Sequence, residues 1–577
     1  MKNLAKFKEK IVITIILLVT VCIASLPAFR DGIYNGFDLW FHMGRIESIA
    51  SELANGQFPV RYESASWYGN GYISSTMYGN TLLYFPAILH ILGFETYKCY
   101  NYYVVFINIL GVIISMYSFS HLFKDKRYGL TATIAYMLAG YYVSNIYMRA
   151  AVGEYTATIF LPLIVYGLYR ILYEDRYCNT IEKVLPLIIG VSGIIQAHIL
   201  TTYMIAMSIF VYLMIFFKDS VKHIKELVVA LISIVCVNVF FLLPFLDSYL
   251  SYSFRANQSL VGVNIQKYGL YFDQILGLFP EGSGGRAEWS SKGEESSRIG
   301  ILVVALLLTF VIYFVINIKS KHEALKSDEK RVLGVFGIGC LAAWMSSAYF
   351  PWGIFSGDNA FSNVMRGVQY PSRYLLIQTL SWIICGVYAL KKIVGTASEL
   401  KQRKNYMLVL GIGFILALAQ NGIFMYTLSC RNLTVQSIEG HESIADDLYL
   451  FAGIDMENIE TEARLIDGDN CIVKDLGYLG DNRQILIDNK SDSEASVLVP
   501  IFCYKYIFAK DSNGTEYKLT PTDSYQYKVT VGSGFSDTMI IHFKEPMLWR
   551  VAECVSLVSI IILILLYVRG TKSKYHE

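Results

Sequence analysis

The sequence predicts an α-helical polytopic membrane protein with about twelve transmembrane helices and a β-sandwich-like domain before the last helix. Of its 577 residues, 54% are hydrophobic and only 17% are charged, a balance unlike that of soluble proteins. Several apolar runs reach about 20 residues, which is enough to cross the hydrocarbon core as a helix. Between residues 431 and 546 these runs give way to short alternating segments, the pattern of β-strands.

Residues 11–29 follow four lysines, but no small-residue cleavage site closes this run, so we interpret it as a retained helix and not a signal peptide. Residues 81–94 are apolar but short and contain Pro86, so an interfacial or re-entrant element is predicted there. The remaining spans are predicted at 100–122, 128–147, 155–173, 183–199, 200–217, 227–249, 299–318, 333–350, 373–390, 406–428 and 548–568.

The basic loops predict the orientation of these spans. If the N-terminus is cytoplasmic, every strongly basic short loop falls on the cytoplasmic side, as the positive-inside rule requires. These loops are 124–127, 218–225, 319–331, 391–404 and the tail 569–574. We therefore expect a multi-pass protein of the cell membrane with both termini in the cytoplasm. The net charge of +2 gives no reason to expect nucleic acid as a partner.

Three domains follow from this pattern. Residues 1–430 form a transmembrane domain with outer loops at 31–98 and 250–298, and residues 547–577 form the last helix and a cytoplasmic tail. Residues 431–546 form the extracytoplasmic β-rich domain between them, with a hairpin turn at 511–514. Its strands are predicted around 485–487, 497–499, 525–531 and 539–543. Two of the ten cysteines, Cys471 and Cys503, lie here, and their spacing leaves open whether they are bonded.

The segment 38–45 carries the most informative polar residues. In a helix, Asp38, His42 and Arg45 would be spaced i, i+4 and i+7 and would share one face. A carboxylate, an imidazole and a guanidinium together at a membrane surface indicate acid–base chemistry beside an anionic headgroup. The alternative is that Asp38 only N-caps an interfacial helix whose apolar residues rest on lipid, namely Trp40, Ile46, Ile49 and Leu53.

Further ionisable residues fall on the same predicted outer side. Arg149 and Glu154 flank the turn between the third and fourth spans, His198 lies at the next outer turn, and Arg373 lies at the mouth of the tenth span. Ionisable groups near a membrane are costly, so several at one face indicate a site, although a single interfacial Arg usually only reaches for headgroups. The bilayer midplane is almost free of charge, which favours a catalytic pocket over a transport path.

These motifs resemble a group of bacterial polytopic membrane proteins. The resemblance rests on Asp38–His42 with Arg45, on 56–61, on Arg149 with Glu154, on 238–244 and on 369–373. The group is labelled 6-pyruvoyl-tetrahydropterin-synthase-related, is similar to the YfhO-like family, and looks like the GT-C glycosyltransferase superfamily. That label implies no pterin chemistry here, because the chain offers no zinc-binding histidine cluster.

The resemblance implies a membrane glycosyltransferase that transfers a sugar from a polyprenyl-phosphate carrier to an extracytoplasmic envelope glycan or lipid acceptor in the bilayer. In this interpretation Asp38 is the general base, with His42 and Glu154 as the other catalytic candidates. The residues expected to bind substrate or phosphate are Arg45, Arg149, His198 and Arg373. The alternative is a non-catalytic envelope protein or lipid-linked-glycan transporter with the same fold.

No cofactor is firmly predicted. If a divalent cation (Mg or Mn) takes part, Asp38 and Glu154 are its candidate ligands. The first loop has a single acidic residue at its motif, whereas many GT-C enzymes have adjacent acidic pairs, so the position of any metal is left open.

Overall fold

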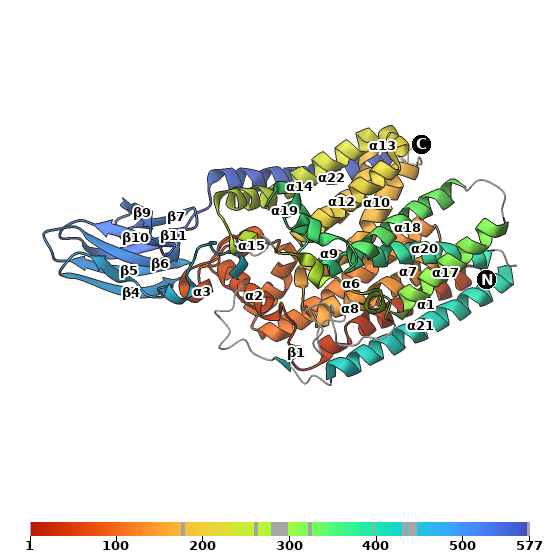
Figure 1. Cartoon of the computed structure of the whole chain (residues 1–577). Coiled ribbons are helices and arrows are strands. Elements are labelled where there is room, and N and C mark those ends of the chain that lie inside the picture. The colour runs from red at the N-terminus through yellow and green to blue at the C-terminus, as the bar shows by residue number, and fades with distance from the viewer. Residues whose placement is uncertain are drawn as a thin grey trace.

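The structure is a computed structural model, and it describes residues 2–174, 179–258, 263–277, 298–320, 326–395, 399–429, 434–435 and 447–573. About half of the predicted outer loop 250–298, namely 259–262 and 278–297, therefore lies outside the described residues. A helical part is joined to a β-sandwich that protrudes from one end of it, and both chain termini lie toward the opposite end (Figure 1).

Long helices make up the helical part. The longer ones are α1 (Lys2–Ala24), α6 (Thr96–Phe123), α11 (Thr180–Ile195), α12 (Ile199–Ile215), α14 (Ile224–Ser251), α17 (Ile301–Ser320), α18 (Ser327–Met345), α20 (Leu375–Gly395), α21 (Glu399–Ser429) and α22 (Met547–Ser573). The last of these, α22, returns from the sandwich and runs beside α14 (Figure 1).

Six helical stretches within the described residues are long and apolar enough to cross a membrane. They are Thr96–Phe123, Val152–Tyr173, Ile224–Ser251, Pro371–Gly395, Lys404–Tyr426 and Met547–Gly570. Each coincides with one of the twelve predicted spans, and the other six spans remain predictions. The protein is thus mostly helical with a membrane-spanning character and a C-terminal β-sheet region.

Two of the predicted spans are each divided into two helices. The span 128–147 is divided into α7 (Lys126–Met137) and α8 (Gly140–Tyr147). The span 155–173 is divided into α9 (Val152–Thr158) and α10 (Leu161–Tyr173), the latter with Pro162 in its first turn. Proline is tolerated there because the first helical N–H groups have no partner within the helix.

The predicted first outer loop is folded and largely buried. It contains α2 (Leu39–Ala54), the short helices α3 (Ser66–Gly69) and α4 (Ser74–Met77), and α5 (Tyr84–Ile91). At eight residues, α5 is too short to cross a membrane, as expected for the segment 81–94. Its outer side exposes Ile88, Ile91 and Leu92.

The C-terminal region forms two antiparallel sheets that face each other. One has the order β3–β6–β10–β9 and the other β4–β5–β11–β7–β8. The bounds are Arg464–Asp467 (β3), Cys471–Leu479 (β4), Asn482–Asn489 (β5), Ala495–Phe502 (β6), Ile507–Lys510 (β7), Glu516–Tyr517 (β8), Leu519–Pro521 (β9), Gln526–Val531 (β10) and Ser536–Phe543 (β11). All four predicted strands and the hairpin turn at 511–514 are confirmed. Cys471 and Cys503 are both free thiols.

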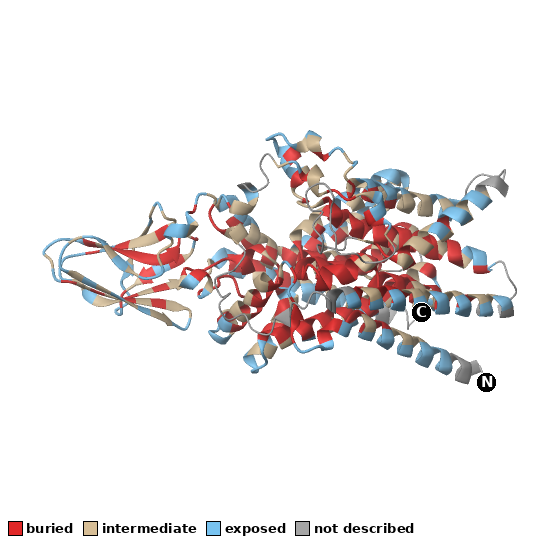
Figure 2. Cartoon of the chain, turned by 60° about the horizontal axis from the view of Figure 1, so that its bottom comes forward, coloured by how far each residue is buried: buried red, intermediate tan, exposed pale blue. Residues whose placement is uncertain are grey.

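The first loop holds the sandwich against the helices. Gly69 accepts hydrogen bonds through its carbonyl from Arg483 Nη1 at 2.8 Å and from the Tyr478 hydroxyl at 2.7 Å. Asn70 Oδ1 accepts from Gln526 Nε2 at 2.6 Å. A short pair of strands, β1 (Ile33–Tyr34) and β2 (Thr434–Val435), ties the start of this loop to the chain that follows α21. Buried residues gather in the middle of the helical part (Figure 2).

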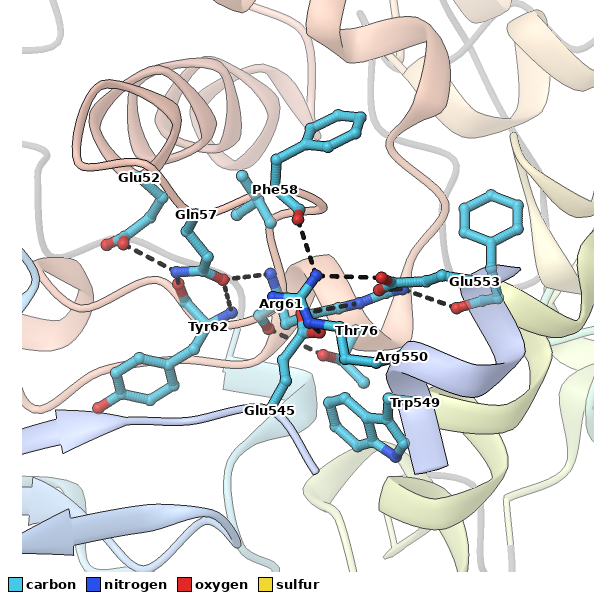
Figure 3. A network of polar contacts seen from close by, with 12 residues as sticks. Glu52, Gln57, Phe58, Arg61, Tyr62, Thr76, Glu545, Trp549, Arg550 and Glu553 are labelled. Atoms are coloured by element: carbon cyan, nitrogen blue, oxygen red, sulfur yellow. Dashed lines mark hydrogen bonds and ion pairs between the residues drawn. The ribbon is translucent and has the colours of Figure 1, made fainter. Parts of the chain in front are cut away.

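A buried charge network joins the same loop to the beginning of the last helix (Figure 3). The Arg61 side chain is 2% exposed and makes ion pairs with Glu545 at 3.5 Å and Glu553 at 3.3 Å. Arg550 binds the same two carboxylates from the solvent side, at 3.0 Å each. The loop, the last strand and the last helix therefore meet at two shared carboxylates.

Candidate functional site

Asp38 precedes α2 but does not cap it. Its side chain makes no capping hydrogen bond, although it occupies the N-cap position. Of the four apolar residues in the interfacial-helix alternative, Ile46 and Ile49 are fully buried in the main core, whereas Trp40 and Leu53 are half-buried. The apolar face of the helix as a whole therefore does not rest on lipid. The segment after Asp38 is helical, so the condition for the spacing of Asp38, His42 and Arg45 holds from Leu39 onward. The Asp38 carboxylate is therefore available for another role.

Close backbone packing places Asp38 beside the turn that carries Arg149. The Asp38 amide donates to the Arg149 carbonyl at 2.8 Å, and the Phe37 amide donates to the Met148 carbonyl at 3.4 Å. Gly36 makes this approach possible, because a Cβ there would lie 2.8 Å from Ala150 Cβ and 2.9 Å from its amide nitrogen. Ala150 itself has φ of 54°, a left-handed conformation that residues other than glycine rarely adopt.

Glu154 is the centre of the polar cluster. Its Oε1 accepts hydrogen bonds from the Tyr141 hydroxyl at 2.7 Å and from Asn145 Nδ2 at 3.1 Å. Its Oε2 forms ion pairs with Arg149 Nη1 at 2.7 Å and with Arg373 Nε at 3.4 Å. Four donors thus engage a carboxylate that is 1% exposed. Because a carboxylate held this way has little lone-pair capacity left, these contacts favour a positioning role for Glu154.

Arg373 is fixed from two directions. Its Nη1 donates to the Val368 carbonyl at 2.9 Å and to Gln369 Oε1 at 2.8 Å, while Nε faces Glu154. Gln369 has φ of 64°, so the chain turns sharply just before the short helix 371–374 that carries Arg373. The guanidinium therefore has a set orientation, which a lone interfacial arginine would lack.

His42, Arg45 and His198 converge on one tyrosine that the sequence did not reveal, Tyr78. The Arg45 guanidinium lies 4.4 Å from the centre of the Tyr78 ring, and its Nη2 donates to the Gly79 carbonyl at 3.2 Å. The rings of His42 and His198 lie 6.0 and 5.7 Å from that of Tyr78. His198 is further held through Nδ1 by Thr201 Oγ1 at 2.8 Å.

Several buried nitrogens of this cluster have no hydrogen-bond partner among the described residues. They are His42 Nδ1, Arg45 Nε and Arg45 Nη1, whereas Arg373 Nε makes no hydrogen bond but is ion-paired with Glu154. Unpaired buried donors are costly and uncommon, and at a cluster of cations they indicate a place for an anionic ligand.

The pKa values of Asp38 and His42 are shifted in opposite directions. Burial raises the pKa of the Asp38 carboxyl, and the positive charges of Arg149 and Arg373 act against that rise. Burial holds the pKa of His42 well below its ordinary value, and the charges of Arg45 and His198 act in the same direction. His42 is therefore a neutral imidazole at physiological pH. A carboxylate of raised proton affinity is better matched to proton abstraction near neutral pH than an ordinary Asp.

The polar cluster therefore unites most of the expected residues. Glu154 forms ion pairs with both Arg149 and Arg373, and the Asp38 amide is hydrogen-bonded to the Arg149 carbonyl. Tyr78 lies in contact with His42, Arg45 and His198. The residues missed from the sequence are neutral partners, namely Tyr78, Tyr141, Asn145 and Gln369. An uncharged side chain in an aromatic-rich sequence gives no signal of its own.

The cluster offers few protein ligands to a divalent cation. Asp38 and Glu154 are its two acidic members, and Glu154 is already engaged by four donors. Among the described residues no group of three or more His, Cys, Asp and Glu side chains is assembled as a metal would need. We therefore assign no step to a metal.

Comparisons with known proteins give limited similarity. No family model matches the chain. An uncharacterized protein of Lactococcus lactis subsp. cremoris (strain MG1363) is 24% identical over 270 residues, which are 45% of this chain and 43% of that protein. The chain thus spans less than half the length of this relative.

Three solved structures of membrane glycosyltransferases align with most of the chain. The Archaeoglobus fulgidus oligosaccharyltransferase in complex with Zn and sulfate is 11% identical with a TM-score of 0.37, over 71% of this chain and 53% of that one. The oligosaccharyltransferase AglB of the same organism, in complex with an inhibitory peptide and a dolichol-phosphate, is 12% identical with a TM-score of 0.41, over 72% and 56%. The mycobacterial arabinofuranosyltransferase AftD is 10% identical with a TM-score of 0.36, over 72% and 27%. TM-scores this low carry no argument about fold or activity.

Proposed function

We propose that this chain is a membrane glycosyltransferase that transfers a sugar from a polyprenyl-phosphate carrier to an extracytoplasmic envelope glycan or lipid acceptor. One observation carries the proposal: Asp38, which makes no capping bond, lies beside Arg149 and within the influence of the positive charge of Arg373, and the buried Glu154 holds both arginines in place. A base adjacent to two fixed cations suits a reaction in which a hydroxyl loses a proton and a phosphate leaves.

The residues have separate roles in this reaction. Asp38 takes the proton of the acceptor hydroxyl while that oxygen forms a bond to the anomeric carbon. The bond from the anomeric carbon to the phosphate oxygen breaks, and Arg373 and Arg149 stabilise the negative charge that develops on the carrier phosphate. Glu154 positions both arginines, and the neutral His42 together with Arg45 and His198 lines the inner side of the site.

The orientation is part of the proposal. We infer that both termini are cytoplasmic and that the site and the sandwich face the extracytoplasmic side. The basic loops support this, as does the position of the termini toward the end of the molecule opposite the sandwich (Figure 1). We propose with it the three domains 1–430, 431–546 and 547–577.

The experiment is Asp38→Asn in the full-length protein reconstituted in liposomes. Asn keeps the size of Asp but cannot accept the proton, so we expect transfer from a labelled polyprenyl-phosphate hexose to fall by about 10²–10⁴-fold. In the wild-type protein, the rate should drop as pH falls through the raised pKa of Asp38, at a higher pH than an ordinary Asp would give.

The same liposomes separate the proposal from its alternatives. Both proteins should elute as a single monodisperse species in detergent, which controls for folding. Wild-type transfer by Asp38→Asn would remove the base from this mechanism. Translocation of the lipid-linked sugar without transfer, in either protein, would instead support a transporter.

A further inference from the structure

A second site lies away from the polar cluster, between α10, α12, α18 and α20. A cavity of about 510 Å³ opens there, within the range of sites that bind small molecules. None of the residues assigned above to sugar transfer lines it. We therefore expect this cavity to bind a ligand other than the substrates of sugar transfer.

The cavity is elongated, and its lining changes from aliphatic at one end to aromatic and polar at the other. Its wall on α20 runs from Ile377 to Gly395, which corresponds to about 27 Å of helix at 1.5 Å per residue. The part nearer the sandwich is aliphatic, with Leu161 and Ile205 on the facing helices. Toward the end where the termini lie, tyrosines replace the aliphatic residues, namely Tyr169, Tyr173, Tyr212 and Tyr388.

Cations surround the tyrosine end. Four basic residues and a single acid are among the lining, namely Lys124, Arg331, Lys391, Lys392 and Asp328. Arg331 is ion-paired to Asp328 at 3.2 Å and lies 3.7 Å from the centre of the Tyr173 ring. Lys392 is exposed and lies 5.2 Å from the Tyr388 ring, whose buried hydroxyl has no hydrogen-bond partner among the described residues. Lys124 lies 3.9 Å from Glu174, and Lys391 donates to the Phe123 carbonyl. Lys392 and Arg331, whose Nε has no hydrogen-bond partner among the described residues, are therefore the cations that can meet an anion at this end.

We propose that this cavity binds an anionic phospholipid, with one hydrocarbon chain along the aliphatic wall and the phosphate at Arg331 and Lys392. A long apolar slot with a basic and aromatic mouth fits an amphipathic ligand, and a water-soluble anion would leave the slot empty. The mouth lies at the end predicted to be cytoplasmic, where anionic lipids of the inner leaflet are available. This lipid site is independent of sugar transfer.

The test is lipid selectivity of the purified full-length protein in detergent. We expect dioleoylphosphatidylglycerol to raise the thermal midpoint and to be retained in native mass spectra at lower concentration than dioleoylphosphatidylcholine. In the double variant Arg331→Gln/Lys392→Gln, affinity for phosphatidylglycerol should fall by about fivefold for each cation removed. Lys225→Gln is the matched control, since Lys225 is an exposed cation near the same end that does not line the cavity.

A second variant tests the slot itself. Ser208 lines the cavity on α12, and Ser208→Trp should fill it and abolish selective retention while Arg331 and Lys392 stay in place. Equal retention of both lipids by the wild type, or unchanged selectivity in both variants, would overturn the proposal. Equal stabilisation by inorganic phosphate would also overturn it, because a bare anion would then suffice.

Discussion

At the scale of single residues, the site depends on how two arginines share one carboxylate. Arg373 contacts Glu154 through Nε and the 368–369 turn through Nη1, so its nitrogens serve different partners. A lysine offers one ammonium on a flexible chain and cannot reproduce a planar fork. The positive charge alone is therefore not enough.

Arg373→Lys tests this geometry. We expect at least a tenfold loss of transfer in a variant that is normally expressed and monodisperse, because the phosphate contact and the bond to Gln369 are not made together. Arg30→Lys is the control, since Arg30 is exposed and contacts Tyr34 on the same predicted outer side. If both lysine variants transferred sugar equally well, Arg373 would be an ordinary interfacial arginine.

The sequence predicted the charged members of this site and missed the neutral ones, for a physical reason. Charged groups are costly near a membrane, so Asp38, Glu154 and Arg373 stand out in an apolar chain. Tyr78 is one of 43 tyrosines, and only the folded chain brings it between two histidines and Arg45.

At the scale of elements, the site exists because two turns approach each other closely. The turn before α2 and the turn between α8 and α9 meet at Gly36 and Ala150, where no side chain separates their backbones. The sequence predicted both turns on one face but gave no indication that they touch. Contact between segments 110 residues apart depends on helix packing, which a periodic pattern does not encode.

Gly36→Val tests the approach. Its side chain would meet Ala150 and Arg149 backbone atoms within about 3 Å, so the two turns should separate and transfer should fall by at least tenfold. Gly44→Ala is the matched control: an added Cβ at Gly44 meets nothing within 4 Å, and alanine is favoured inside a helix. Equal activity of these two variants would show that Asp38 does not need this turn.

At the scale of the whole molecule, the sandwich strands were predictable and their attachment was not. Short apolar or alternating patterns predicted β5, β6, β10 and β11. Every second residue of β5 faces the sandwich core, whereas β6 is buried along nearly its whole length. The attachment uses backbone carbonyls, such as that of Gly69, and the charges around Arg61. Backbone groups are the same at every residue, so they leave no trace in the sequence.

Arg61 and Arg550 offer a matched pair for testing this attachment, since both bind Glu545 and Glu553 (Figure 3). The Arg61 side chain is 2% exposed, whereas that of Arg550 is 47% exposed. Removing one partner of a buried ion pair typically costs about 3–5 kcal/mol, against about 0–1 kcal/mol for an exposed pair. The burial of each arginine, and not the number of its contacts, should therefore determine how much stability is lost when it is replaced.

We expect Arg61→Gln to lower the thermal midpoint of the detergent-solubilised protein markedly, and Arg550→Gln to change it little. Arg61→Lys should recover part of the loss, because it returns a cation to the two carboxylates without the bond from Arg61 to the Phe240 carbonyl. Similar thermal midpoints for Arg61→Gln and Arg550→Gln would mean that Glu545 and Glu553 are more hydrated than their burial indicates. The first loop would then be held to the last helix by apolar packing and by the bond from Arg550 to the Phe58 carbonyl, while the bonds of Gly69 and Asn70 still hold it to the sandwich.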